Sequence, residues 1–199
     1  MKRIVLASGN PGKIREIGAL LAPLAIEVVP QSDLGISEAE EPYETFLENA
    51  LAKARHASRA AGLPALADDS GLSVDALGGA PGVHSAYYAG REGNREQRDA
   101  RNNAKLLAGL KDNRKAHYTC VIVFLEHCKK APLVAEGIWR GEIAREPRGG
   151  NGFGYDPLFF IKELKKTAAE LDPAEKNRIS HRGIALAKLL ELLRESSRA

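Results

Sequence analysis

Two adjacent carboxylates, Asp68 and Asp69, follow a short apolar run and precede Ser70-Gly71. The run predicts a buried strand that ends at the pair, which would project at least one carboxylate from the end of a sheet edge into a crevice. Neighbouring acidic groups are costly unless a cation or solvent neutralises them, and carboxylate oxygens are ligands that suit Mg²⁺. The alternative is a solvated aspartate pair that caps a helix or forms a turn.

An acidic connection that contains Glu38, Glu40 and Glu41 offers further carboxylates. One of them could complete a metal site with the aspartate pair. An acidic loop is, however, more often only a solvated loop.

A glycine-containing loop, Ser8-Gly9-Asn10-Pro11-Gly12-Lys13, lies where an apolar run passes into a helical pattern. Free N–H groups at the start of a helix bind phosphate oxygens, and Lys13 adds a positive charge. The loop is not a Walker A motif, because Ala7 and Ile14 stand where that motif has glycine and serine or threonine. A plain strand-to-helix turn is the competing interpretation.

Two further segments combine aromatic rings and hydrogen-bond donors. Gly152-Phe153-Gly154-Tyr155-Asp156 presents two rings on a glycine-rich backbone, either as a stacking surface for a base or as a packed turn. Lys176-Asn177 and Ser180-His181-Arg182 precede the last helix and can either bind carbonyl or phosphate oxygens or cap the helix.

The elements expected around these residues alternate between strands and helices. Apolar patterning predicts strands at 3–7, 26–29, 63–67, 118–125 and 133–143, the last two as an antiparallel hairpin. Helices are predicted from Ile14 to Leu24, at 46–61 with a Thr45/Glu48 capping box, at 95–110, from Asp172-Pro173, and along the leucines of 186–193. This alternation favours an α/β fold with a mixed sheet.

Composition limits the class of protein. The 199 residues have 44% hydrophobic and 28% charged side chains and a net charge of only +3, which fits one globular domain and gives no basic nucleic-acid footprint. The two cysteines, Cys120 and Cys128, have no metal-ligand partners in the sequence, and no apolar run approaches the ~18–20 residues that span a bilayer. We therefore expect a cytoplasmic protein with reduced thiols that binds neither membrane nor nucleic acid.

Six motifs, taken in order along nearly the whole chain, resemble those of the inosine/xanthosine triphosphate pyrophosphatase family. They lie at residues 8–13, 45–50, 67–72, 79–83, 152–157 and 176–182. The resemblance implies a homodimer of single two-lobed domains, each covering residues 1–199, with an elongated mixed β-sheet flanked by helices and a nucleotide cleft between the lobes. It also implies Mg²⁺-dependent hydrolysis of ITP, dITP, XTP and dXTP to the monophosphate and pyrophosphate, which removes these purine nucleotides from the pool.

The resemblance assigns roles residue by residue. Asp69 is the catalytic residue and, with Glu40 or Glu41, a metal ligand; Asp68 stands beside it. The predicted substrate-binding residues are Ser8, Gly9, Asn10, Pro11, Gly12, Lys13, Lys53, Ser70, Phe153, Gly154, Tyr155, Asp156, Lys176, His181 and Arg182.

The chain departs from the family pattern at one place. Ser85-Ala86-Tyr87-Tyr88 has tyrosine at 87, where many relatives have arginine, so any ion pair of that arginine is missing here. Two other functions stay open on the residues alone: a catalytically silent purine nucleotide sensor and an RNA-binding protein. The aspartate pair argues against the first, and the near-neutral charge argues against the second.

Overall fold

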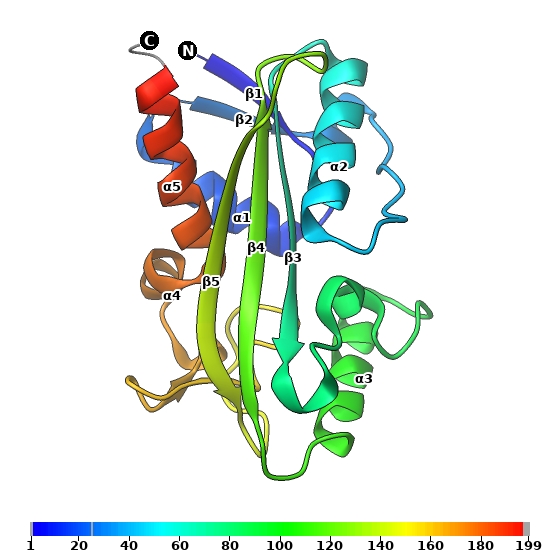
Figure 1. Cartoon of the computed structure of the whole chain (residues 1–199), viewed down its shortest axis with the longest axis vertical. Coiled ribbons are helices and arrows are strands. Elements are labelled where there is room, and N and C mark those ends of the chain that lie inside the picture. The colour runs from blue at the N-terminus through cyan, green and yellow to red at the C-terminus, as the bar shows by residue number, and fades with distance from the viewer. Residues whose placement is uncertain (1, 25, 197–199) are drawn as a thin grey trace. The chain divides into compact units, whose positions relative to one another are not determined.

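The computed structural model describes residues 2–24 and 26–196 (Figure 1). The chain forms two compact units. Unit 1 comprises the chain up to Asp69, Cys120–Gly137 and the segment from His181 onward, and unit 2 comprises Ser70–Thr119 and Ile138–Ser180. No helix among the described residues is both long and apolar enough to cross a membrane.

One seven-stranded sheet has the strand order β2-β1-β3-β4-β5-β6-β7. Its strands are β1 (Lys2–Leu6), β2 (Ile26–Pro30), β3 (Ala65–Val74), β4 (Lys115–Leu125), β5 (Leu133–Ile143), β6 (Phe159–Ile161) and β7 (Lys166–Thr167). β1 pairs in parallel with β2 and β3, whereas β6 pairs antiparallel with β5 and β7. The sheet is therefore mixed, and the predicted α/β class is confirmed.

The α-helices are α1 (Pro11–Leu21), α2 (Phe46–Ala61), α3 (Arg95–Ala108), α4 (Pro173–Ile179) and α5 (His181–Ser196). Of these helices, α1, α2, α3 and α4 begin after a residue whose side chain caps the first turn. Thr45 accepts a hydrogen bond from the N–H of Glu48, and Asp172 accepts one from Ala174 beside Pro173 at the first helical position. Such caps bind N–H groups that have no partner within the helix, so they fix where each helix begins.

Unit 1 has two hydrophobic clusters, separated by the alternation of side chains along its strands. One cluster joins Ile17 and Leu21 of α1 and Leu186 of α5 to Leu66 and Ile122. The other packs alanines of α2 against side chains of opposite parity on the same strands. Helices therefore cover both faces of this part of the sheet, with α1 and α5 on one face and α2 on the other.

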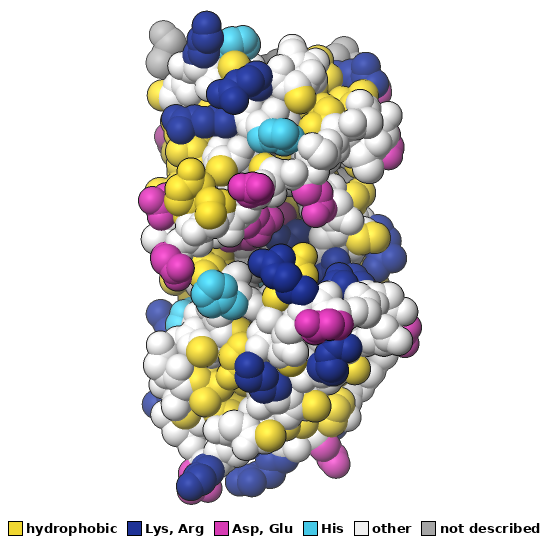
Figure 2. Space-filling model, turned by 90° about the vertical axis from the view of Figure 1, so that its right-hand side faces the viewer, with side chains coloured by type: hydrophobic (Ala, Val, Ile, Leu, Met, Phe, Trp, Pro, Cys, Tyr) yellow, Lys and Arg dark blue, Asp and Glu magenta, His cyan; other side chains and the backbone are white. Residues whose placement is uncertain are grey.

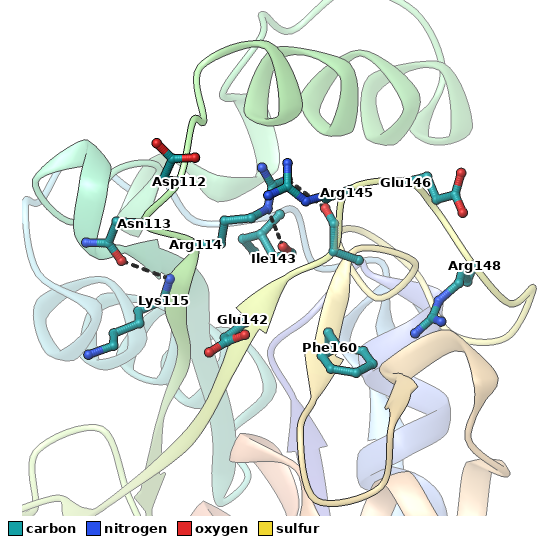
Figure 3. Close-up of a pocket in the computed structure, with 11 residues that line it drawn as sticks. Asp112, Asn113, Arg114, Lys115, Glu142, Ile143, Arg145, Glu146, Arg148 and Phe160 are labelled. Carbon is teal, nitrogen blue, oxygen red and sulfur yellow. Dashed lines mark hydrogen bonds between the residues drawn. The ribbon is translucent and has the colours of Figure 1, made fainter.

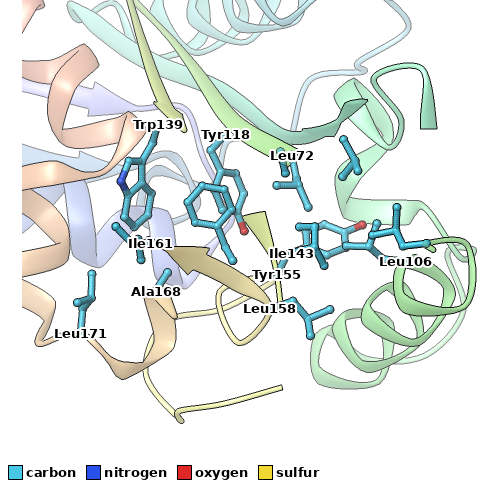
Figure 4. Packing of buried hydrophobic residues seen from close by; sticks show 14 residues of the cluster. Leu72, Leu106, Tyr118, Trp139, Ile143, Tyr155, Leu158, Ile161, Ala168 and Leu171 are labelled. Carbon is cyan, nitrogen blue, oxygen red and sulfur yellow. The ribbon is translucent and has the colours of Figure 1, made fainter. Parts of the chain in front are cut away.

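Unit 2 has its own core, which combines aliphatic side chains with aromatic rings (Figure 4). The ring centroid of Phe159 lies 4.7 Å from that of Tyr118 and 4.9 Å from that of Trp139. Leu106 of α3 and the ring of Tyr155 belong to the same cluster. This packing fixes both α3 and the segment that carries Tyr155.

Two predicted boundaries need correction. The strand expected to end at Asp68 continues to Val74, so both aspartates lie inside a central strand and not at the end of one. Leu24, predicted to lie on the helix that begins near Ile14, belongs to a short 3₁₀ turn at Ala22–Leu24. The last helix, α5, begins at His181, so His181 and Arg182 lie within it and not before it as predicted. β6 and β7 were not predicted, and the other predicted helices and strands lie close to their predicted positions. The face of the molecule in Figure 2 carries interspersed acidic, basic and hydrophobic side chains.

Candidate active site

The predicted site residues divide between the two units. Unit 1 contains the loop at 8–13, Glu40, Glu41, Lys53, Asp69, His181 and Arg182. Unit 2 contains Ser70, Phe153, Gly154, Tyr155, Asp156 and Lys176. The first segment of unit 1 ends at Asp69 and the first segment of unit 2 begins at Ser70, the next residue of β3.

Asp68 is a buried carboxylate that binds two cations. Its Oδ2 atom lies 3.0 Å from Nζ of Lys13 and accepts hydrogen bonds from Nε and Nη2 of Arg182 at 3.3 and 3.1 Å. Burial alone would raise the pKa of Asp68, but Lys13 and Arg182 hold it below its usual range. Asp68 is therefore ionised and fixed in place.

Asp69 lies on the opposite face of β3, because successive residues of a strand alternate. Its Oδ1 atom accepts a hydrogen bond from Nζ of Lys53 on α2 at 3.0 Å. Its Oδ2 atom is buried and has no hydrogen-bond partner among the residues that the structure describes. Burial raises the pKa of Asp69, although Lys53 and Lys13 oppose the shift. This carboxylate thus has one fixed oxygen and one oxygen available to a ligand or proton.

The acidic connection reaches the same lysine through Glu41. Its Oε1 atom lies 3.1 Å from Nζ of Lys53, so Asp69 and Glu41 flank one ammonium group. Both carboxylates raise the pKa of Lys53, which burial alone would lower. Glu40 and Glu41 are both exposed, and of the two only Glu41 forms an ion pair with Lys53 among the described residues. The geometry therefore favours Glu41 as the carboxylate that works with Asp69.

The loop at 8–13 begins α1, as expected for a phosphate-binding loop. Oδ1 of Asn10 accepts hydrogen bonds from the N–H groups of Gly12 and Lys13 at 2.9 and 3.2 Å, and Ser8 Oγ accepts one from Asn10. These N–H groups are capped in this structure, so a phosphate would have to share or replace the Asn10 contacts. The ammonium group of Lys13 reaches Asp68 from the same loop.

The structure places Arg182 in the interior of unit 1. Its guanidinium group contacts Asp68 and also forms an ion pair with Glu16 of α1. Asp68 and Glu16 raise the pKa of Arg182 against the effect of burial. His181 is buried at the start of α5, where its carbonyl group lies so close to Gly137 that a side chain at 137 could not fit. Glu16 was not predicted from the sequence.

In unit 2, the segment at 152–156 is organised around the carboxylate of Asp156. Oδ2 of Asp156 accepts hydrogen bonds from Nζ of Lys176 at 2.5 Å and from the N–H of Phe153 at 2.9 Å. Gly152 has φ +78°, and a side chain there would collide with the same oxygen. Nζ of Lys176 lies 5.0 Å from the ring centroid of Phe153, so a cation and a half-buried ring lie together.

Tyr155 belongs to the core of unit 2. It is 4% exposed, and its hydroxyl group donates a hydrogen bond to the carbonyl oxygen of Ser85 at 2.9 Å. Of the two rings, Phe153 is therefore the better placed to contact a ligand.

Helix α3 holds this segment through residues that the sequence analysis missed. Oδ2 of Asp99 accepts a hydrogen bond from the N–H of Gly154 at 3.0 Å, and Nδ2 of Asn103 donates one to the carbonyl oxygen of Gly154 at 2.9 Å. The guanidinium group of Arg95 lies 5.1 Å from the ring centroid of Phe153. Spacing by four residues puts Arg95, Asp99 and Asn103 on one helical face, a signal that was present in the sequence.

Tyr87, which stands where the resemblance leads us to expect arginine, makes cation–π contacts. The guanidinium groups of Arg91 and Arg98 lie 4.2 and 5.6 Å from the centroid of its ring. The aromatic ring therefore brings two cations together, which an arginine at this position would repel.

Asp69 and Glu41 fit a magnesium ion by their chemistry. Mg²⁺ is commonly held by one or two carboxylates together with substrate phosphates and water. The buried Oδ2 atom of Asp69, which lacks a partner among the described residues, is suited to such a ligand role. The described part of the chain has no group of three or more His, Cys, Asp or Glu side chains that could hold a metal.

Comparison with known proteins relates the chain to one family over almost its whole length. The model of the Ham1 family matches residues 4–192. A Ralstonia nicotianae protein named dITP/XTP pyrophosphatase is 62% identical over 198 residues, which are 98% of each chain. A Nitrosomonas europaea protein of the same name is 60% identical, over 98% of this chain and 96% of its own.

A solved structure agrees with these sequence relationships. The HAM1 protein from Coxiella burnetii has a TM-score of 0.87 and 50% identity, over 98% of this chain and 100% of its own. The fold, the family model and the sequence identities agree, so the chain belongs to the Ham1 family.

Proposed function

We propose that this protein hydrolyses ITP, dITP, XTP and dXTP to the nucleoside monophosphate and pyrophosphate. Relatives with about 60% identity over nearly the whole chain are named dITP/XTP pyrophosphatase. The observation that carries the proposal is the carboxylate of Asp69, with one oxygen fixed by Lys53 and the other buried without a partner among the described residues. A protein that only bound a polyanion would gain nothing from that carboxylate.

In this proposal, Asp69 orients a water molecule and accepts its proton as the water attacks the α-phosphorus. Lys53 holds Oδ1, so that Oδ2 is the oxygen left for the water. Asp68 acts through its ion pairs with Lys13 and Arg182 and positions both cations.

Positive charge for the triphosphate comes from Lys13 and Lys53, which stabilise the charge that develops on the leaving pyrophosphate. Asp69 and Glu41 would hold Mg²⁺, which when bound neutralises phosphate charge and lowers the pKa of water. The lysines are pre-positioned by Asp68, Asp69 and Glu41, so little reorganisation is needed when the substrate arrives.

The group in unit 2 is assigned to the purine base. The ring of Phe153 offers a stacking surface, and Lys176 offers a donor beside it. Hypoxanthine and xanthine present a 6-oxo acceptor, whereas adenine presents an amino donor at that position. A donor left without a partner is costly, and we therefore expect kcat/KM to be lowest for ATP. Guanine keeps the 6-oxo group but adds a 2-amino donor, and we expect GTP to lie between ATP and the pair of ITP and XTP because that donor would be left without a partner.

Incubation of the protein with ITP and Mg²⁺, followed by phosphorus NMR, tests the proposal. We expect IMP and pyrophosphate as the first products, and no products when EDTA is present. Orthophosphate and IDP as first products would place the cleavage at the other anhydride bond and contradict the assignment. Binding of ITP without any product would instead identify a nucleotide sensor.

We also propose that the protein is a homodimer. β5 alternates buried with exposed residues, and Val134 and Ile138 are among the exposed large hydrophobic side chains. Exposed apolar residues of this kind suit an isologous contact with a second copy. Light scattering should give twice the chain mass of 21.5 kDa at micromolar concentration. A mass of one chain would contradict this.

A further inference from the structure

Unit 2 has a pocket of about 660 Å³ that contains none of the residues assigned to the reaction (Figure 3). Its walls come from residues 112–115 at the start of β4, residues 142–148 at and after the end of β5, and Phe160 of β6. Four of its side chains are basic: Arg114, Lys115, Arg145 and Arg148. The pocket is therefore a candidate for a ligand of its own.

Arg114 is fixed in this pocket by neutral acceptors only. Its Nε atom donates to the carbonyl oxygen of Ile143 at 2.6 Å, Nη2 donates to that of Ala144 at 2.7 Å, and Nη1 donates to that of Lys111 at 3.2 Å. Three of its five N–H groups are thereby used, and two stay available. The carbonyl groups hold the guanidinium in one orientation but do not cancel its charge.

A second guanidinium group, that of Arg145, lines the same pocket. Burial and this neighbouring charge lower the pKa of Arg114. Arg145 is exposed, and no carboxylate lies within ion-pair distance of it among the residues that the structure describes. Two like charges therefore line one pocket without a counter-ion from the described part of the chain, and an anion between them would relieve their repulsion.

The acidic residues of the pocket do not supply that counter-ion. Glu142 pairs with Lys162 at 2.7 Å. Figure 3 shows the carboxylates of Asp112 and Glu146 at opposite ends of the pocket, well away from the guanidinium of Arg114. The positive charge at the centre of the pocket is thus not matched by its walls.

We propose that the pocket binds a small phosphate-bearing anion between Arg114 and Arg145. The planar fork of a guanidinium group matches two oxygens of a phosphate, and a doubly charged anion removes the repulsion between the two arginines. Carbonyl groups have already oriented Arg114, so little side-chain freedom is lost when the anion binds. This proposal does not depend on the reaction proposed above.

Proton–nitrogen correlation NMR of the arginine Nε–H groups in the full chain tests whether the pocket binds a phosphate-bearing anion. Inorganic phosphate, pyrophosphate and IMP are titrated separately, with potassium chloride at equal ionic strength as the control. We expect the Nε–H signal of Arg114 to shift and saturate with a phosphate-bearing probe but not with chloride. Tighter binding of IMP than of phosphate would identify a nucleotide as the ligand, and equal binding would identify the phosphate group alone.

Arginine variants test whether the anion binds in this pocket. Arg145→Ala should weaken binding at this signal by about tenfold or more, because one charged fork is lost, and Arg145→Lys should fall between it and the wild type. Arg178→Ala, which removes an exposed arginine of α4 outside the pocket, should bind as the wild type does. The proposal is overturned if no phosphate probe gives a saturable shift, if chloride gives the same shift, or if Arg145→Ala binds unchanged.

Discussion

Nζ of Lys53 donates a hydrogen bond to Oδ1 of Asp69 at 3.0 Å. Oδ2 of the same carboxylate is buried and has no hydrogen-bond partner among the described residues. The neighbouring Asp68 contacts Lys13 and Arg182 instead. The two aspartates of the tandem are therefore in different environments, which predicts different effects when each is replaced by its amide.

Asp69→Asn should lower kcat for ITP by roughly 10²–10⁴, because the proton acceptor is removed. Lys53 keeps its ion pair with Glu41 in this variant, so the free energy of unfolding should fall by only about 1 kcal/mol. Steady-state kinetics and thermal denaturation measure the two effects. Near-normal turnover in this variant would show that another residue accepts the proton.

Asp68→Asn should act mainly on stability. It leaves Lys13 and Arg182 facing a neutral group in a buried environment, and the loss of one partner of a buried ion pair costs about 3–5 kcal/mol. Urea denaturation at neutral pH measures the change, with Asp69→Asn as the matched control. Equal stability of the two variants would contradict the assignment of Asp68 as the partner that fixes both cations.

Glu41→Gln should raise the Mg²⁺ concentration for half-maximal activity by about tenfold or more, since one charged ligand is lost. Glu40→Gln is the matched control, because Glu40 is the adjacent and exposed glutamate. Activity is measured across a magnesium titration at saturating ITP. If the Glu40 variant shows the larger shift, the ligand is Glu40 and the contact between Glu41 and Lys53 has another purpose.

Asp99→Ala should raise KM for ITP by about tenfold, because the N–H of Gly154 loses a charged acceptor. Asp99→Asn keeps an acceptor oxygen and should recover part of this loss. Inhibition by inorganic tripolyphosphate, which has no base, should be unchanged in both variants. Glu96→Gln, on the same helix without a recorded contact to the segment, serves as the control. A parallel weakening of tripolyphosphate inhibition would mean a general loss of structure.

Local patterns were sufficient to predict the helices, the longer strands and the mixed sheet, but not the short strands β6 and β7. The apolar runs, the Thr45 cap of α2 and the Asp172-Pro173 start of α4 are signals within a few residues, and the structure shows each of them. The predicted end of the strand at the aspartate pair was wrong, because two charged residues interrupt the apolar pattern by which a buried strand is recognised. The two aspartates can be buried because they pair with cations from distant parts of the chain, namely Lys13, Lys53 and Arg182.

The same limit applies to the site. The sequence could nominate Glu40 and Glu41 together, but only the contact with Lys53 distinguishes them. Arg182 and Tyr155 were nominated as substrate-binding residues, and the structure places the first against Asp68 and Glu16 and the second in the core of unit 2. Asp99 and Asn103 act through a glycine more than 50 positions away, a separation that no local pattern reports.

The pairing of Asp68 with Arg182 joins residues 114 positions apart. A ribosome that adds about 5–20 residues per second reaches Arg182 roughly 6–23 s after it has added Asp68. Until then, Asp68 lacks one of its two cationic partners, and burying it would leave a poorly compensated charge in an apolar interior. We infer that the nascent chain keeps β3 accessible to water and completes unit 1 only once α5 has been made, so that ribosome-stalled chains lacking α5 remain targets for chaperones and proteases.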